Sequence, residues 1–508
     1  MSLDLTFGAG LLLSCAIAIL ASKFATKRSR YPLPPGPYGL PLLGNALQMP
    51  TSHEWLTFAA WGKAFGGVIH VSIFGRPIII LNSRKAISDL LEAKSGIYSD
   101  RPVLPMAGEL VGYDASLPLI RYGARHREYR KLMYSGLALQ KIEEIHPIQE
   151  QKIRDFLQSL LESPNQFQTH IRRTVASIVF QISHGYSVTK DDDPLVQLAE
   201  RATHEFSLAS APGSFFVDLL PILKYIPDWF PGATFKKTAK AWRQTMVQLR
   251  DEPYKSVKDQ VLRGVALPSF TASLVERNAQ PTEEEEDIYK WTSTAFYSGG
   301  ADTTVSAIST FFLAMVLNPE AQRKAQDELG KVLGRGRLPT FGDRDRLPYI
   351  EALIKEIYRW NPVAPLALPH RLTQDDVYDG FFLPEGAIVF ANTWGIFHDP
   401  DIYPSHADFI PERFLSPENS DVNPDPRPFA FGYGRRVCPG KHLADASLFM
   451  LVASTLSMFK ISPAKDKNEM PIIPVPNYQP GVISHPADFK CCITPRYSEA
   501  ELFMQLGK

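Results

Sequence analysis

The sequence predicts an α+β fold that is mainly helical and carries small β-sheets. Residues from about 142 to 333 follow a helical pattern of apolar residues with few breaks. Two β-rich runs, 68–73 and 77–81, lie on either side of Gly75 and are typical of a hairpin. Further on, 387–390 reads as a third, short strand. Short strands on both sides of a long helical region distinguish this prediction from an all-helical fold.

The N-terminal segment, 1–22, is predicted to be a membrane anchor. Its apolar run, 5–21, is uncharged and just long enough to span a bilayer. Basic residues follow the run and only Asp4 precedes it, which is the reverse of a secretory signal peptide. We therefore expect a single-pass anchor with its basic side in the cytosol, the alternative being a cleaved signal peptide.

Residues 23–38, basic and then proline-rich, would form a stiff hinge. Residues 39–508 would form one large domain, since no repeat or low-complexity linker divides them.

Composition and cysteine content fit a globular body that faces the cytosol. The chain has 508 residues, of which 44% are hydrophobic and 21% charged, enough to bury a large core. Its formal net charge is +0, so no nucleic-acid-binding surface is indicated. The four cysteines, Cys15, Cys438, Cys491 and Cys492, define no disulfide framework, and no Asn-x-Ser/Thr acceptor occurs. Both observations favour a reducing compartment.

A long helix is predicted over 288–317, after five acidic residues, 283–287, that suit the positive end of a helix dipole. Its interior reads Tyr-Ser-Gly-Gly-Ala-Asp-Thr-Thr over 297–304. Two adjacent glycines inside a helix cost about 1 kcal/mol each relative to alanine, and they can open a groove where a small ligand approaches the backbone. Asp302 and Thr303 at mid-helix can disturb the hydrogen-bond ladder and hold water. The alternative is a kinked helix with a polar patch.

A second helix, 349–360, carries Glu356 and Arg359 three residues apart, so both side chains lie on one face. A further arginine, Arg413, lies in Pro-Glu-Arg-Phe, 411–414. Two arginines around one carboxylate can satisfy its hydrogen bonds when the group is buried. We therefore predict a structural cluster of these three side chains.

A cysteine, Cys438, lies in a loop rich in glycine and arginine, just before a helical pattern at 441–456. A thiolate is a strong axial ligand for haem iron. Gly434 and Gly440 let the backbone pass close to a flat ring. Backbone N–H groups, the positive end of the following helix and Arg436 are all expected to stabilise a thiolate, and Arg436 can also pair with a haem propionate. The alternative is a buried structural cysteine in a turn.

Together these three segments resemble the cytochrome P-450 monooxygenases. Residues 431–440 fill every fixed position of the haem-binding loop, F-x-x-G-x-R-x-C-x-G. Residues 299–304 are similar to the oxygen-activating helix, G-G-x-D-T-T. Glu356, Arg359 and Arg413 are similar to the E-x-x-R and P-E-R-F triad, which holds the haem loop in place. The motifs occur in the family's order, and the resemblance covers nearly the whole chain.

The resemblance implies a haem b cofactor whose iron takes Cys438 as its axial ligand. The cofactor-binding residues that it implies are Cys438, Arg436, His370, Arg101, Arg130, His126, Phe431, Gly434 and Gly440. Four of them, Arg101, Arg130, His126 and His370, match positions that bind haem propionates. The family usually has tryptophan where this chain has His126, whose ring N–H can still donate a hydrogen bond. The alternative for each of these basic residues is a solvent-exposed side chain that does not bind haem.

The activity implied is that of a monooxygenase that hydroxylates or otherwise oxidises a lipophilic small molecule with O₂. By the resemblance, Thr303 and Asp302 are the catalytic residues: Thr303 hydrogen-bonds the bound oxygen, and Asp302 relays protons toward it. The chain is also similar to fungal microsomal members of secondary metabolism. That likeness implies the endoplasmic reticulum membrane, a catalytic domain that faces the cytosol, and a terpenoid substrate. Oxidation of an aromatic or indole metabolite is the alternative.

Two other functions stay open, a haem-thiolate isomerase or dehydratase and a non-enzymatic haem sensor or carrier. The Asp302-Thr303 pair argues against the isomerase, because such enzymes commonly lack it.

The chain has no flavin or dinucleotide-binding fingerprint, so its electrons would come from NADPH through cytochrome P-450 reductase. The expected docking residues are Arg435, Lys441, Arg127, Arg130 and Lys131. The substrate pocket is expected from 102–119, 205–216, 296–303 and 363–368.

Overall fold

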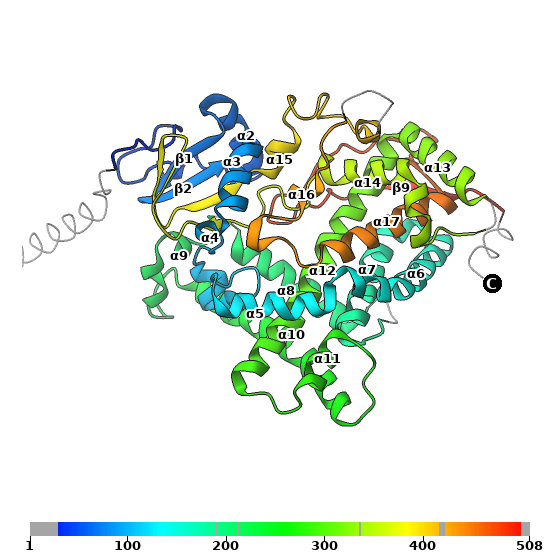
Figure 1. Cartoon of the computed structure of the whole chain (residues 1–508), viewed down its shortest axis with the longest axis horizontal. Coiled ribbons are helices and arrows are strands. Elements are labelled where there is room, and N and C mark those ends of the chain that lie inside the picture. Colours follow the sequence, from blue (N-terminus) through cyan, green and yellow to red (C-terminus); the bar gives the residue numbers. More distant parts are fainter. Residues whose placement is uncertain (1–28, 189–191, 212, 335–336, 416–421, 499–508) are drawn as a thin grey trace, which may run out of the picture.

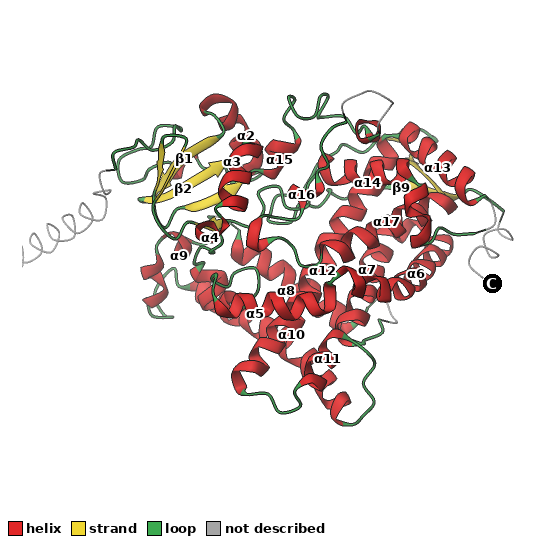
Figure 2. Cartoon of the chain, in the orientation of Figure 1, coloured by secondary structure: helices red, strands yellow, loops and turns green. Residues whose placement is uncertain are grey.

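The computed structural model describes residues 29–188, 192–211, 213–334, 337–415 and 422–498. Helices make up most of the chain, with β1 and β2 at one end of the molecule and β9 at the other (Figures 1 and 2). The predicted fold class, α+β and mainly helical with small sheets, is therefore confirmed. The predicted membrane anchor, 1–22, and the start of the hinge lie outside the described residues.

The largest sheet has four strands in the order β1-β2-β6-β3. β1 (Val68–Ile73) and β2 (Arg76–Leu81) pair antiparallel, which confirms the predicted hairpin. β2 pairs in parallel with β6 (Ile388–Ala391) along the whole length of β6, and β3 (His370–Arg371) pairs antiparallel with β6. Gly75 adopts φ +76° in the hairpin turn, where a residue without a Cβ is favoured. This sheet brings a segment from the second half of the chain against the N-terminal hairpin.

Two smaller sheets complete the β-structure of the described residues. β4 (Asp376–Tyr378) pairs antiparallel with β5 (Phe381–Leu383). The other sheet has the order β8-β7-β9, with β7 at Phe459–Lys465, β8 at Pro471–Ile472 and β9 at Cys491–Pro495. Cys491 and Cys492 thus lie on a strand, away from the loop that contains Cys438.

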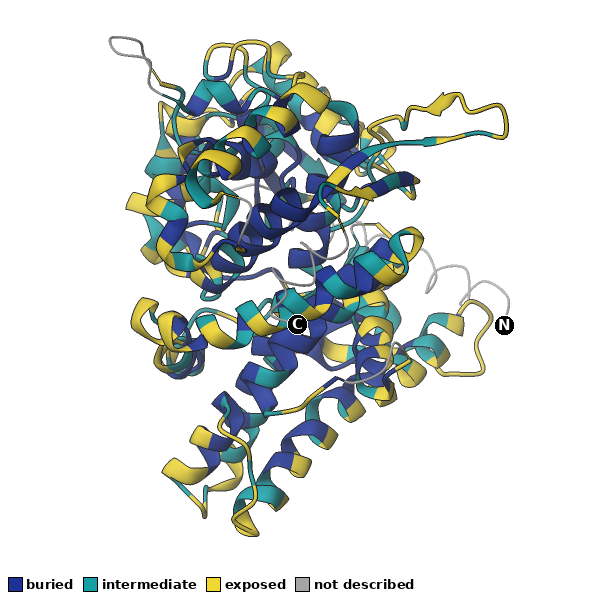
Figure 3. Cartoon of the chain, turned by 90° about the vertical axis from the view of Figure 1, so that its right-hand side faces the viewer, coloured by how far each residue is buried: buried dark blue, intermediate teal, exposed yellow. Residues whose placement is uncertain are grey.

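The helices surround one long central helix, α12. Their bounds are α2 Glu54–Phe65, α3 Arg84–Ile87, α4 Ser95–Tyr98, α5 Ala124–Leu137, α6 Leu139–Glu162, α7 Phe167–His184, α8 Pro194–Ser210, α9 Phe216–Leu219, α10 Thr234–Leu262, α11 Phe270–Arg277, α12 Glu283–Leu317, α13 Pro319–Leu333, α14 Pro348–Trp360, α15 Thr393–Phe397, α16 Arg427–Ala430 and α17 Lys441–Met458. Buried residues gather on the inner helices and exposed ones on the outer loops (Figure 3). The main core lies between α6, α7, α12, α14 and α17.

The helix α12 starts at Glu283 because Thr282 caps it. The Thr282 hydroxyl accepts a hydrogen bond from the backbone N–H of Glu285, whose side chain in turn accepts one from the Thr282 N–H. The acidic run is therefore a helix start, as predicted. In the part of the chain that the structure describes, α12 is also the one helix apolar and long enough to cross a membrane. Because 67% of its apolar window is buried, it is the core helix of the domain.

Candidate active site

The cysteine-containing loop joins α16 to α17 and is held by its own backbone. The N–H of Cys438 donates to the carbonyl of Phe431 at 2.8 Å. Gly434 adopts φ +52°, and a Cβ there would lie 2.1 Å from the carbonyl oxygen of Leu91. No other residue type fits this position without moving the backbone. The structure shows that glycine here lets the loop pack on Leu91. The predicted role of Gly434 beside a flat ring stays a prediction.

Opposing effects act on the Cys438 thiol. Burial raises its pKa, and this effect outweighs those that lower it. The lowering effects come first from a hydrogen bond with the Gly440 N–H, then from the charges of Arg130 and Lys441. The N–H of Gly440, just before α17, thus acts on the sulfur as predicted. The cations that act on the sulfur are Arg130 and Lys441, and Arg130 also donates to the carbonyl of Val437.

The predicted role of Arg436 beside the sulfur is wrong. Its guanidinium donates to the carbonyls of Ser99 and Ile120, each at 2.7 Å, and to that of Leu117 at 3.4 Å. These carbonyls lie before α5, so Arg436 ties the loop to that segment. Its side chain therefore points into a cluster of other cations.

That cation cluster contains Arg101, His126, His370 and Arg436, all of them buried. It forms because the backbone N–H of Arg371, in β3, donates to the carbonyl of Asp100 at 2.9 Å. This antiparallel bridge puts His370 beside Arg101. Arg101 donates to the carbonyls of Leu368 and Pro369 at 2.7 and 2.8 Å. The four side chains come from segments far apart in the sequence.

The positive charges of the cluster are not balanced by the acidic groups around it. Burial and the charge of Arg436 hold the pKa of Arg101 well below its usual range. Burial and the neighbouring arginines lower the pKa of His126 to about 3, and burial and Arg101 hold the pKa of His370 well below its ordinary value. Asp100 lies nearby, but Arg121 donates to it at 3.1 Å and the Tyr122 N–H at 2.8 Å.

Two buried nitrogen atoms in this cluster have no hydrogen-bond partner among the described residues, Nε of Arg101 and Nδ1 of His126. Nδ1 of His370, in contrast, donates to the carbonyl of Tyr98 at 2.6 Å. Buried polar atoms are nearly always paired in folded proteins. Two buried arginines, Arg101 and Arg436, beside unpaired nitrogen atoms are therefore suited to bind an anionic group.

The structure brings Glu356, Arg359 and Arg413 together. Nε and Nη2 of Arg359 donate to the two Glu356 oxygens at 2.7 Å each, and Nε of Arg413 donates to the same carboxylate at 3.2 Å. Glu356 and Arg359 are fully buried. Arg359 also donates to the carbonyls of Phe397, His406 and Asp408. The cluster thus ties α14 to 397–413. Between Glu356 and Arg359 on the same helix, Tyr358 packs on Phe431 of the loop with ring centroids 5.3 Å apart.

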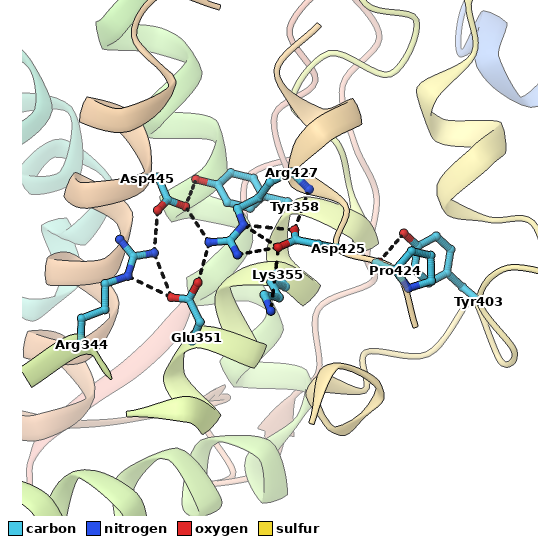
Figure 4. A network of polar contacts seen from close by, with 9 residues as sticks. All are labelled: Arg344, Glu351, Lys355, Tyr358, Tyr403, Pro424, Asp425, Arg427 and Asp445. Atoms are coloured by element: carbon cyan, nitrogen blue, oxygen red, sulfur yellow. Dashed lines mark hydrogen bonds and ion pairs between the residues drawn. The ribbon is translucent and has the colours of Figure 1, made fainter. Parts of the chain in front are cut away.

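A second ionic network, which no sequence pattern indicates, holds the loop from both sides. Arg427, at the start of α16, donates to Asp425 and to Glu351 of α14, both at 2.5 Å (Figure 4). Arg344 donates to Glu351 at 2.9 Å and to Asp445 of α17 at 2.6 Å. Asp425 and Arg427 precede Cys438 and Asp445 follows it, so the network fixes both ends of the loop. None of these side chains has a motif spacing that would reveal it.

Asp302 and Thr303 lie in α12, which stays helical through both glycines. The hydroxyls of Thr303 and Thr304 donate back to the carbonyls of Gly299 and Gly300, both at 2.8 Å. Gly299 is exposed, and a Cβ there would meet nothing within 4 Å. The helix therefore has open space beside Gly299 and Thr303, as the predicted groove requires, and it contains no break.

The comparison with known proteins fits this geometry. The sequence model of the family described as Cytochrome P450 matches residues 34–493. The chain belongs to the cytochrome P450 family. It is 45% identical over 494 residues to cytochrome P450 monooxygenase 208 of Postia placenta, covering 96% of each chain. It is 42% identical to cytochrome P450 monooxygenase claR of Ampulloclitocybe clavipes, over 94% of this chain and 89% of that one. It is also 40% identical to tryptamine 4-monooxygenase of Psilocybe cyanescens, over 93% and 94%.

The chain is accordingly a cytochrome P450 monooxygenase, and proteins of this family use haem b with a cysteine thiolate as axial ligand. The residues present fit that group. The cation cluster offers unpaired nitrogen atoms to the carboxylates of a haem, and Cys438 lies in a loop shaped by Gly434. The other cysteines that the structure describes, Cys491 and Cys492, lie on β9.

Proposed function

We propose that this cytochrome P450 monooxygenase oxidises an uncharged lipophilic molecule, a terpenoid of fungal secondary metabolism, with O₂ and electrons from NADPH. The observation that supports the haem site most is the buried cation cluster with its unpaired nitrogen atoms. Arg101, Arg436 and His126 bind the haem propionates, with Arg130 between the cluster and the loop. His370 completes the site; because its Nδ1 hydrogen is bonded to Tyr98, its Nε2 donates only when the ring is protonated.

Cys438 supplies the thiolate ligand. When bound, the haem would supply the chemistry that activates O₂, which a thiolate ligand favours. The residues of this chain then control protons. The hydroxyl of Thr303 donates to the Gly299 carbonyl, so it needs only a rotation about χ1 to turn toward the open space beside the helix. Asp302, the next residue back, passes protons on toward that hydroxyl. Together they deliver protons and keep reduced oxygen from leaving before the substrate is oxidised.

Thr303→Ala should keep NADPH consumption but raise the hydrogen peroxide released per product. Asp302→Asn should instead slow turnover about 10²–10⁴-fold, because that is what a positioned acid typically contributes. Thr304→Ala is the matched control, since Thr304 makes the same bond to the helix backbone but its side chain is buried. The measurement is NADPH, peroxide and product in one reaction. Unchanged coupling in Thr303→Ala would remove Thr303 from the mechanism.

Two of the four pocket segments, 296–303 and 363–368, favour a substrate without charge. Residues 363–368 contain only apolar side chains, and in 296–303 the one charged residue, Asp302, is paired with His485. An ammonium group would therefore have no free counter-ion in these two segments. The relative named for tryptamine favours an indole as the second candidate. Titrating terpenoids and indoles against the haem absorption spectrum separates the two, and binding of tryptamine but no terpenoid would contradict the proposal.

Electrons come from a separate NADPH-cytochrome P450 reductase that docks on a basic surface near the loop. Arg127 and Arg435 both lie over the ring of Tyr122, at 5.9 and 5.2 Å from its centroid, and Lys131 is 74% exposed. Arg130 contributes little to this surface, because it is half-buried and donates to the loop. An acidic partner is suited to such a patch.

Lys131→Glu should raise the reductase concentration needed for half-maximal rate and leave the haem spectrum unchanged. Reductase-supported turnover should also fall as salt shortens the Debye length from ~10 Å toward ~3 Å. Lys465→Glu on β7, also exposed, is the control that should behave as wild type. If neither salt nor Lys131→Glu changes the reductase dependence, the docking surface lies elsewhere.

The protein is held on the endoplasmic reticulum membrane by residues 1–22, with the catalytic domain in the cytosol. An exposed apolar surface supports this position. It consists of Leu42, Leu47, Phe216, Ile222, Tyr225 and Trp229, each at least 68% exposed. The β1–β2 hairpin links its two halves: Gly44 bridges Ile73, and Arg76 donates to the carbonyl of Asp218 at 2.7 Å. The first described residues lie at this same end (Figure 1).

Deleting residues 1–28 should release the protein from membranes while the haem site still forms, because no site residue lies there. Through its exposed apolar surface, the truncated protein should still bind lipid vesicles weakly, and added salt should not reduce this binding. Flotation of the truncated protein with vesicles, together with its haem content, measures both effects. Loss of haem on truncation would show that the deleted segment is part of the fold.

A further inference from the structure

The carboxylate of Asp302 has a partner that no sequence motif indicates, the imidazole of His485. Nε2 of His485 lies 3.1 Å from Oδ1 of Asp302. The two side chains are 18% and 25% exposed, so the pair is largely shielded but still reaches solvent. A histidine in this place differs from a permanently charged partner, because histidine ordinarily gains and loses a proton near neutral pH.

The backbone around His485 is fixed to the helix that carries Asp302. The preceding residue, Ser484, is fully buried, and its carbonyl accepts from the hydroxyl of Ser306 in α12 at 2.7 Å. The N–H of Ser484 donates to the carbonyl of Val363 at 2.8 Å, and the carbonyl of His485 accepts from the N–H of Gln479 at 2.7 Å. These bonds hold the ring at Asp302 through the main chain, so the pairing does not depend on a flexible side chain alone.

On another side, Asp302 borders a small open hollow between α7, α8 and α12, with about 30 Å³ of room for water. Arg172 and Glu200, both exposed, line this hollow, as does Thr203. Water in the hollow is therefore a competing source of protons for Asp302. A path through His485 and a path through the hollow predict different results for changes at position 485.

We propose that His485 is the proton donor to Asp302 and also holds its carboxylate in position. This inference rests on the role proposed above for Asp302. A proton leaves Nε2 of the protonated ring and binds Oδ1 of Asp302, and the neutral ring regains a proton from water. Asp302 returns to the carboxylate when it passes that proton on toward Thr303. Each cycle moves one proton inward from solvent. No electron is transferred, and the only covalent bonds that form or break are those to the proton.

Two variants separate relay from positioning. His485→Gln keeps an N–H donor near the place of Nε2 but cannot pass a proton through its side chain, whereas His485→Leu removes both functions. With reductase, NADPH and the compound that shifts the haem spectrum most, both variants should lose about tenfold or more in product rate. Adding either change to Asp302→Asn should cost little further, because both act on one path.

A second readout is independent of turnover. Chemical unfolding of wild type, His485→Leu, Asp302→Asn and the double variant should show non-additive shifts in midpoint, and His485→Gln should stay close to wild type. If Asp302→Asn is slow but His485→Leu or His485→Gln keeps full activity, the relay through His485 is wrong while the role of Asp302 stands. The protons would then come from water in the hollow. Full activity in Asp302→Asn would overturn the proposed role of Asp302 and the relay together. Additive unfolding shifts would overturn the positioning.

Discussion

Glu356→Gln should abolish haem incorporation and strongly destabilise the fold. The substitution keeps the size of the side chain but removes the charge that two buried arginines share, and Arg359 has no exposure through which water could compensate. Breaking a buried ion pair by removing one partner costs ~3–5 kcal/mol. Domains are stable by only ~5–15 kcal/mol, so the segment that connects α14 to the cysteine loop should lose its fixed position. Denaturant unfolding and haem content per protein measure both effects.

Glu320→Gln is the matched control for that experiment. Glu320 also pairs with an arginine three residues later, Arg323 at 2.7 Å, but both side chains are about 60% exposed. An exposed pair contributes ~0–1 kcal/mol, so this variant should bind haem as wild type does. If Glu356→Gln protein bound a full complement of haem and unfolded at the wild-type midpoint, the triad would have no role in holding the loop.

Cys438→Ala should abolish NADPH-dependent oxidation of any substrate. The change removes the thiolate and leaves the neighbouring bonds of the loop, such as that from the residue 438 N–H to Phe431, free to form. The surrounding structure should therefore survive, and circular dichroism should match wild type. Cys492→Ala on β9 is the control that should retain full activity. Product formation by Cys438→Ala at the wild-type rate would exclude Cys438 from the chemistry.

The sequence was most informative where a local pattern determines structure. The hairpin around Gly75, the helix that starts at the acidic run and the helix after Cys438 all follow from short-range periodicity, turn residues and capping. The start of α12 at Glu283 follows from one capping pair, Thr282 with Glu285. The contiguous motifs around Asp302 and Cys438 likewise needed no tertiary information, since each lies within a single turn or loop.

Long-range contacts determine the rest, and no local pattern encodes them. Arg436 was expected beside the sulfur, but the carbonyls of Ser99 and Ile120 draw its guanidinium into the cation cluster instead. Arg130, from α5, takes its place near the sulfur. The direction of a long side chain is set by the acceptors around it, and those acceptors come from segments that meet only in the folded chain.

The same reason explains the residues that sequence reasoning missed. Arg427 and Asp445 have no recognisable spacing, and their pairing exists only because α14 lies between the two ends of the loop. His485 follows a buried serine in a segment without regular structure, so neither periodicity nor a motif marks it. A pair such as His485 and Asp302 can be found only once the backbone is known.

The difference spectrum of the reduced carbon monoxide complex tests the central claim most directly, namely that Cys438 binds the haem iron as a thiolate. The measurement compares wild type, Cys438→Ala and Cys492→Ala at equal haem content. Wild type and Cys492→Ala should show the red-shifted band typical of a thiolate ligand, and Cys438→Ala should lack it completely. Survival of that band in Cys438→Ala would contradict the account, because another residue would then hold the iron.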